Sequence, residues 1–169
     1  MPVLPWRILA RDVLLLLLAA LVWRADAALR GQPGALATLV AVAAGALAAI
    51  AVYLAHEWGH LLAARAAGSR VHYPARVTST FLFFFDVGAN DRRQFLAMSL
   101  GGFAASAIAL PVLFESVPAG ALSSWVAIGL AGAGLVATLA TELPPFWRVM
   151  RGAPLPRGFV YRDGARQGV

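Results

Sequence analysis

Residues 56–60, His-Glu-Trp-Gly-His, contain the pattern H-E-x-x-H. Two histidines four residues apart lie on one face of a helix, where both imidazoles can bind the same metal ion. Glu57 directly follows the first histidine, which is where a general base acts on water in zinc-dependent hydrolysis. The pattern therefore predicts that His56 and His60 bind Zn2+ and that Glu57 is the catalytic residue of a peptide hydrolase.

The motif lies in an apolar stretch, residues 35–64, that holds no other charged side chain. Ionisable groups at membrane depth are costly and usually mark a functional site. H-E-x-x-H also occurs by chance in soluble helices, but the apolar setting disfavours that interpretation. The sequence predicts an intramembrane metalloprotease.

Composition supports a membrane protein. Of the 169 residues, 60% are hydrophobic and 13% are charged, and the mean hydropathy is +0.74, values typical of a polytopic membrane protein. All fourteen basic residues are arginines, and no basic run alternates with aromatic residues, so we expect no nucleic-acid partner. Cysteine is absent, which excludes disulfides and thiolate metal sites.

Four apolar stretches predict an all-α membrane protein with about four transmembrane helices, and hence the lipid bilayer as a partner. They are residues 8–22, 35–64, 95–114 and 122–143. We expect one metalloprotease-like domain over residues 1–150 and a disordered basic cytoplasmic tail over residues 151–169, which are rich in proline, glycine and arginine. The first stretch is short, and with Ala25-Asp26-Ala27 behind it a cleaved secretory signal is the alternative.

The distribution of arginines predicts the orientation. Arginines gather before the first stretch, between the second and third, and after the fourth, so both termini and the middle loop should face the cytoplasm. His56 and His60 then lie about 30 Å along the second span, near the cytoplasmic edge of the bilayer. We expect a multi-pass protein of the cell membrane. The arginine-only, alanine-rich composition favours a bacterial cytoplasmic membrane.

The middle loop, residues 68–93, has its own pattern. Residues 71–78 mix β-branched, aromatic and polar types, residues 80–85 are strongly apolar, and residues 87–91 are typical of a turn. This predicts a short membrane-associated β-hairpin whose open edge pairs with an extended substrate strand. A loop that rests on the membrane without strands is the alternative.

A hydrolytic zinc site needs a third protein ligand. Glu142 is the preferred candidate because it ends the fourth stretch at nearly the depth of the two histidines, and Pro144-Pro145 should break the helix just beyond it. An ion pair between Glu142 and Arg148 is the alternative. Asp86, after the apolar run of the loop, is the second candidate ligand, and His72 is expected to be an ordinary loop residue.

Small residues suggest close helix contacts around the site. Gly101, Gly102 and the alanines after them open the third stretch, and Gly129, Gly132 and Gly134 line the fourth. Ser106 is a candidate hydrogen-bond donor to substrate.

The motif and its continuation resemble a known family. Residues 56–68, HEWGHLLAARAAG, resemble the H-E-x-G-H helix and the following A-x-x-x-G turn of the site-2 proteases, which are intramembrane zinc metalloproteases. Residues 99–106, SLGGFAAS, are a weaker match to the family's A-G-P-x-x-N segment, with Phe103 in place of proline and Ser106 in place of asparagine. The family also has a membrane-associated β-hairpin between these two segments.

The third motif departs from the family pattern. The family's N-x-x-P-x-x-P-L-D-G supplies an aspartate as the third zinc ligand, whereas residues 141–149 read TELPPFWRV, with Trp147 at that position. Glu142 replaces the aspartate, or Asp86 does, or the chain is a catalytically inactive membrane scaffold or binding protein that keeps the protease fold. The intact Glu57 favours activity.

The resemblance implies a zinc endopeptidase that cleaves transmembrane segments of other membrane proteins near the cytoplasmic face. A chain of this length leaves no room for a soluble regulatory domain, so we expect any regulation to come from a membrane partner. A metal transporter is disfavoured, because a transport path needs polar sites across the whole membrane. Substrate-binding residues are not indicated.

Overall fold

The computed structural model of the protein describes residues 4–157 and 161–162. Within this part of the chain, four helices and three short strands form the fold. The helices are α1 (Trp6–Leu29), α2 (Ala35–Ala66), α3 (Arg92–Ser116) and α4 (Leu122–Met150), and the strands are β1 (Val71–His72), β2 (Phe84–Asp86) and β3 (Tyr161–Arg162). The predicted helical architecture, with a β-hairpin after the second helix, is confirmed.

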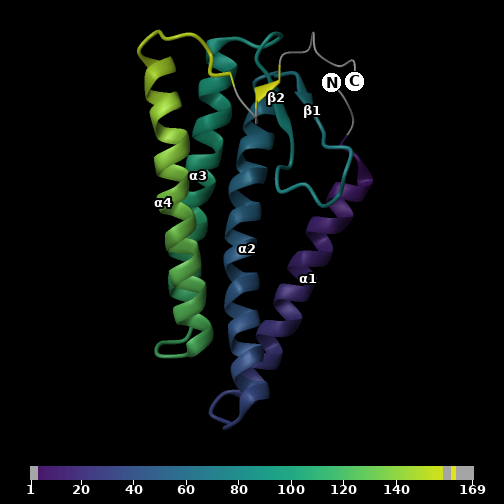
Figure 1. Ribbon diagram of the computed structural model, residues 1–169, viewed down its shortest axis with the longest axis vertical. Helices are drawn as coiled ribbons and strands as arrows, with labels where there is room; N and C mark the ends of the chain where they lie inside the picture. The colour runs from purple at the N-terminus through teal and green to yellow at the C-terminus, as the bar shows by residue number, and fades with distance from the viewer. Residues whose placement is uncertain (1–3, 158–160, 163–169) are drawn as a thin grey trace.

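Helix α2 is the centre of the arrangement, since it packs against α1, α3 and α4, and α3 also packs against α4 (Figure 1). The sheet lies at the end of the molecule where α2 ends and α3 begins, and the α1–α2 and α3–α4 connections lie at the opposite end. The start of α1 and the end of α4 lie at the same end as the sheet.

Local sequence explains where the helices begin and end. Asp91 caps α3: its side chain accepts a hydrogen bond from the Gln94 amide at 2.9 Å, while the Gln94 side chain accepts one from the Asp91 amide at 2.8 Å. Gly68 ends α2 with a positive φ of 72°, a conformation that glycine adopts without strain. These two ends fix the length of the loop that lies beside the motif.

The strands are shorter than predicted. Val71 pairs with Phe85 and His72 with Phe84 in an antiparallel hairpin, and β2 also pairs with β3 in parallel. Residues 73–83, expected to be largely extended strand, form neither helix nor strand. Pro74 has no amide hydrogen to donate to a neighbouring strand, and several backbone groups between residues 77 and 82 bind side chains of the helices instead.

The buried core gathers at the sheet end. Phe85 and Phe95 are each 1% exposed, and their rings meet edge to face with centroids 6.0 Å apart. Around them pack Leu61 and Ala64 of α2 and Val149 of α4. The hairpin is thereby fixed to the end of α2 that carries the H-E-x-x-H motif.

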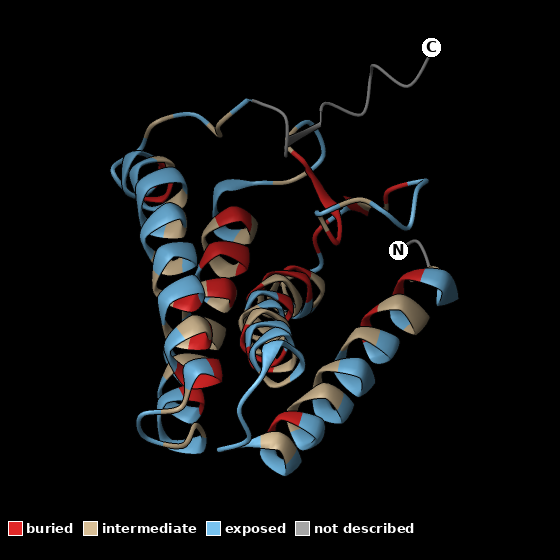
Figure 2. Cartoon of the chain, turned by 60° about the horizontal axis from the view of Figure 1, so that its bottom comes forward, coloured by how far each residue is buried: buried red, intermediate tan, exposed pale blue. Residues whose placement is uncertain are grey.

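Much of the helical surface is apolar and exposed. Leu14, Leu36, Ile108, Trp125 and Val136 are 65% to 68% exposed, and Figure 2 shows exposed residues along the outer faces of the helices. Apolar surface on this scale is rare on soluble proteins. Helices α2, α3 and α4 are each long and apolar enough to cross a membrane. Helix α1 is not among them, since charged residues lie near both of its ends.

Helix α4 does not end where predicted. Pro144 and Pro145 lie inside it, and it continues to Met150. Neither proline can donate an amide hydrogen, so the carbonyls of Ala140 and Thr141 lack their usual partners four residues ahead. The prediction that these prolines break the helix is wrong.

Part of the predicted C-terminal tail is described. The Gly152 and Ala153 amides close the end of α4 through the carbonyls of Val149 and Arg148, and Leu155 packs against the core. Strand β3 belongs to the same tail. Residues 158–160 and 163–169 lie outside the described residues.

Candidate metal centre

His56 and His60 lie one turn apart on the buried face of α2, 4% and 8% exposed. Their rings are nearly perpendicular, with centroids 4.3 Å apart, and the two Nε2 atoms are separated by 2.9 Å. The spacing of four residues therefore brings one nitrogen of each ring to a common point, as the sequence predicted.

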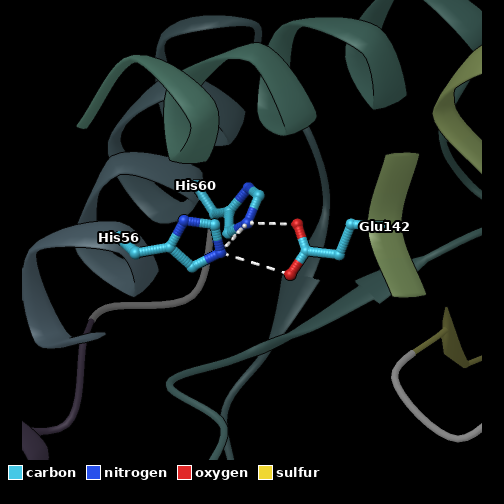
Figure 3. Close-up of side chains that lie close together, drawn as sticks. All are labelled: His56, His60 and Glu142. Atoms are coloured by element: carbon cyan, nitrogen blue, oxygen red, sulfur yellow. Dashed lines mark hydrogen bonds and ion pairs between the residues drawn. The ribbon is translucent and has the colours of Figure 1, made fainter. Parts of the chain in front are cut away.

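Glu142 reaches this point from α4 (Figure 3). Its Oε1 lies 3.2 Å from Nε2 of His56, and its Oε2 lies 3.1 Å from Nε2 of His60. One ligand atom from each of the three residues falls within 4.8 Å of the others, the one such group among the described residues. The prediction that Glu142 reaches the depth of both histidines is confirmed.

The other nitrogen of each ring has a backbone partner. Nδ1 of His60 lies 2.9 Å from the Met98 carbonyl, and Nδ1 of His56 lies 3.0 Å from the Gly102 carbonyl. A carbonyl oxygen only accepts, so in each ring Nδ1 carries the proton, and Nε2 of a neutral ring presents a lone pair. Such Nδ1 contacts orient metal-binding histidines in proteins.

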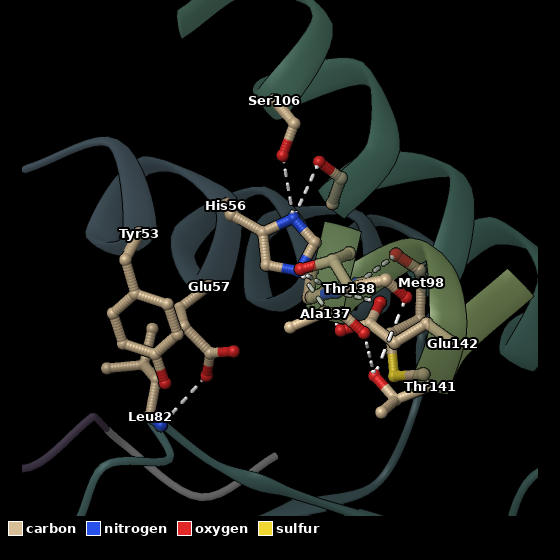
Figure 4. A network of polar contacts seen from close by, with 12 residues as sticks. Tyr53, His56, Glu57, Leu82, Met98, Ser106, Ala137, Thr138, Thr141 and Glu142 are labelled. Atoms are coloured by element: carbon tan, nitrogen blue, oxygen red, sulfur yellow. Dashed lines mark hydrogen bonds and ion pairs between the residues drawn. The ribbon is translucent and has the colours of Figure 1, made fainter. Parts of the chain in front are cut away.

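Ser106 supports His56 as well. Its Oγ lies 2.9 Å from Nδ1 of His56, as a second acceptor beside the Gly102 carbonyl (Figure 4). The sequence suggested that Ser106 contacts a substrate, but the structure places it behind the metal-ligand candidate.

The three residues fit a zinc ion. In a tetrahedral site with ligand bonds of about 2.0–2.2 Å, neighbouring ligand atoms are about 3.3–3.6 Å apart. The two Nε2 atoms are 2.9 Å apart and lie 3.2 and 3.1 Å from different oxygens of Glu142, so the three side chains would have to spread slightly around an ion. Two lone pairs and a carboxylate that converge in a buried place repel one another unless a cation or a proton lies between them.

Glu57 lies on the same turn of α2. Its Oε2 accepts a hydrogen bond from the Leu82 amide at 3.1 Å (Figure 4). A cavity of about 570 Å³ is lined by Glu57, His60 and Glu142 and, on the side of the loop, by Phe81, Phe83 and Phe85. Glu57 and two of the candidate ligands, His60 and Glu142, therefore face one cavity, within the size range of ligand-binding sites.

Asp86 lies outside the cluster. One of its oxygens is 2.9 Å from Nε2 of His72, and the other accepts hydrogen bonds from the Gly88 and Ala89 amides. Asp86 and His72 therefore hold the hairpin and its turn together. Asp91 caps α3, as described above.

Close contact between α2 and α3 depends on glycine. A Cβ on Gly59 would lie 2.5 Å from the Gly101 carbonyl, and one on Gly101 would lie 2.4 Å from the Gly59 carbonyl. Such close approach brings the carbonyls of α3 to the histidines. By contrast, a Cβ added at Gly129, Gly132 or Gly134 of α4 would meet no atom within 4 Å, so the prediction of tight packing is wrong for these three.

Asp12 is not among the residues predicted from the sequence. This carboxylate of α1 is 2% exposed, accepts a hydrogen bond from Nε1 of Trp58 at 2.9 Å and pairs with Arg11 at 2.7 Å. The sequence did contain an indication of this role, because Asp12 is a charged residue within the apolar stretch of residues 8–22, just as Glu57 is a charged residue within an apolar stretch.

Comparisons of the chain with protein-family models, with curated proteins and with solved structures find no match in any of the three.

Proposed function

We propose that the protein is an intramembrane zinc endopeptidase. The observation that carries the proposal is the convergence of His56, His60 and Glu142 beside Glu57, at the junction of two largely apolar helices, α2 and α4. Two histidines and a glutamate are a ligand set of catalytic zinc sites, which leave one position open. The resemblance of residues 56–68 to the site-2 proteases agrees with this interpretation.

The membrane setting follows from the helices. In this proposal α2, α3 and α4, which are long and apolar enough, cross the bilayer, and α1, which packs along α2, would be a fourth crossing. The arginine-rich end with the sheet faces the cytoplasm, as the positive-inside rule expects, and the membrane is the bacterial cytoplasmic one. The site then lies close to the cytoplasmic surface, where water has a short path to it.

The chemistry divides between the metal and Glu57. When bound by His56, His60 and Glu142, Zn2+ supplies a Lewis acid that activates water and polarises the scissile carbonyl. Glu57 accepts a proton from the attacking water and later donates it to the nitrogen of the leaving amine. The Leu82 amide holds one carboxylate oxygen of Glu57, which leaves the other free for the proton.

The substrate is a transmembrane segment of another membrane protein, cut near its cytoplasmic end. Helical amides are hidden in their own hydrogen bonds, so the segment must unwind locally before attack. The phenylalanine-lined wall of the cavity suits apolar side chains of such an unwound stretch. Both edges of β2 are already paired, so an added substrate strand would pair with an outer edge of the described sheet, that of β1 or that of β3.

The test measures zinc and hydrolysis in the same detergent-purified samples of wild type, His60→Ala and Glu57→Gln. The substrate is a reporter peptide with a dye and a quencher on either side of one leucine- and alanine-rich span of about 20 residues, ending in Gly-Ser on the cytoplasmic side, where a helix unwinds most easily. We expect near-stoichiometric zinc in wild type and in Glu57→Gln, little in His60→Ala, and hydrolysis by wild type alone.

A folded wild type that neither retains nor takes up zinc would overturn the proposal. The chain would then be a non-catalytic membrane scaffold or binding protein with a protease-like fold. Wild type and Glu57→Gln could both bind zinc and both fail to hydrolyse the reporter. That result would count against Glu57 as a general base.

A further inference from the structure

Arg11 of α1 binds the loop that reaches Glu57. Its Nη1 donates to the carbonyls of Val77 at 2.9 Å and Ser79 at 2.7 Å, and its Nε donates to Oδ1 of Asp12 at 2.7 Å. The planar guanidinium can make all three hydrogen bonds at once, and the carboxylate beside it balances its charge. Arg11 therefore links α1 to loop residues that lie more than sixty positions later in the sequence.

The same loop is held from α2. Tyr53 donates its hydroxyl to the Thr80 carbonyl at 2.6 Å, and Glu57, one turn further along α2, accepts from the Leu82 amide at 3.1 Å. Residues 77–82 have no strand partner, so these side chains satisfy backbone groups that a sheet would otherwise pair. The position of the Leu82 amide thus depends on Arg11 and Tyr53.

Asp12 closes a ring of contacts. Its second oxygen accepts from Trp58, the residue next to Glu57 in the motif. The ring runs from Asp12 through Trp58 and Glu57 to Leu82, back along residues 79–82 to Arg11, and from there to Asp12. A side chain on α1 is therefore linked to Glu57 on two sides.

We propose that Arg11 is a positioning residue for Glu57. It holds residues 77–82 so that the Leu82 amide fixes one oxygen of the Glu57 carboxylate and leaves the other turned to the cavity. This inference rests on the proposed function, since it assigns Arg11 a part in the hydrolysis that Glu57 performs. Without Arg11, residues 77–82 lose two charge-assisted hydrogen bonds and the Leu82 amide no longer orients the base.

Arg11→Met, Arg11→Lys and Arg7→Met test the proposal. Arg7 lies one turn earlier on α1 and is exposed, and its side chain makes no hydrogen bond or ion pair with the described residues, so Arg7→Met removes the same charge without the contacts. Hydrogen exchange of the peptide covering residues 77–85 reports how the loop is held, whether or not zinc is bound. Zinc content, kcat and KM with the reporter peptide report the effect on the site.

We expect Arg11→Met to keep its zinc, to exchange the amides of the peptide covering residues 77–85 about 10-fold faster or more, and to lose kcat by about 10- to 100-fold at nearly unchanged KM. Arg11→Lys should recover part of both effects, because an ammonium can still donate to one carbonyl. Arg7→Met should match wild type.

Three results would overturn the inference. If Arg11→Met has the same hydrogen-exchange rate over residues 77–85 and the same kcat as Arg7→Met, Arg11 does not position Glu57. A higher kcat in Arg11→Met would show that residues 77–82 obstruct the site. If Arg11→Met loses both its zinc and its activity, Arg11 would be needed for the structure of the whole site and not for the position of Glu57 alone. A wild type without zinc and without hydrolysis is a different failure, which removes the proposed function and, with it, a role for Arg11 in catalysis.

Discussion

The imidazole of His60 lies directly against Gly102: a Cβ on this glycine would be 2.2 Å from Cε1 and 2.3 Å from Nε2 of the ring. No real side chain tolerates such distances, so either the ring or the backbone of α3 would have to move. Gly102 also offers its carbonyl to Nδ1 of His56. A residue without a side chain therefore holds both histidines in their positions.

Gly102→Ala should lower zinc affinity by about 100-fold, the upper range for changes behind the metal ligands, because the added methyl group displaces His60. Zinc titration with a competing chelator measures this. Gly129→Ala is the matched control, since nothing lies within 4 Å of a side chain at Gly129. Equal affinity in the two variants would mean that α3 can move away without disturbing the site.

Glu142→Gln should lower zinc affinity by more than about 100-fold, because an amide is a far weaker zinc ligand than a carboxylate. Asp86→Asn should keep its zinc, because Asp86 is occupied by His72 and the turn amides. The zinc content per mole of each dialysed variant shows whether Glu142 or Asp86 is the third ligand. Zinc lost from Asp86→Asn but not from Glu142→Gln would assign the third ligand to the hairpin.

Removal of the metal should destabilise the protein. A ligand that binds only the folded state adds about 4 kcal/mol at a free concentration 1,000-fold above its Kd. A chelator should therefore lower the thermal midpoint of wild type, measured by tryptophan fluorescence in detergent, and zinc should restore it. His60→Ala is the control, and a chelator effect of equal size in that variant would show that the stabilising metal is bound elsewhere.

A second prediction of stability concerns the opposite end of the bundle. Asp26 of α1 is 5% exposed, accepts a hydrogen bond from Ser123 of α4 at 2.9 Å and pairs with Arg30. Asp26→Leu would leave the buried Ser123 hydroxyl without an acceptor, which should cost about 1–3 kcal/mol in unfolding experiments with a denaturing detergent. Asp26→Asn keeps an acceptor and should cost less. Equal losses would assign the stability to the ion pair with Arg30.

The predictions from sequence that succeeded are those that depend on the geometry of individual helices. The spacing of His56 and His60 determines their common face, and the length of the fourth apolar stretch places Glu142 at the same depth. Both predictions depend only on helical geometry and on the antiparallel course of neighbouring spans.

Contacts between segments were harder to predict. The Asp12–Trp58 hydrogen bond joins residues 46 positions apart, and nothing in local periodicity indicates which carboxylate an indole will meet. Residues 73–83 have strand-forming side chains, yet their backbone binds Arg11, Tyr53 and Glu57 instead, a tertiary effect that overrides propensity. Pro144 and Pro145 stay within α4, and Phe146 and Val149 just beyond them are buried, a tertiary contact that local sequence does not indicate.

Each of the four helices has a segment without charged residues, and together these segments form an uncharged layer. Residues 13–23, 35–52, 95–114 and 122–141 contain no charged side chain, while the candidate site and the Asp26–Ser123 contact lie on opposite sides of this layer. A proton cannot cross such a layer without a side chain to carry it or a chain of water. If the protein hydrolyses peptides at Glu57 as proposed, water and protons would reach this residue from one side of the layer only, and the ion gradients across the membrane would be preserved.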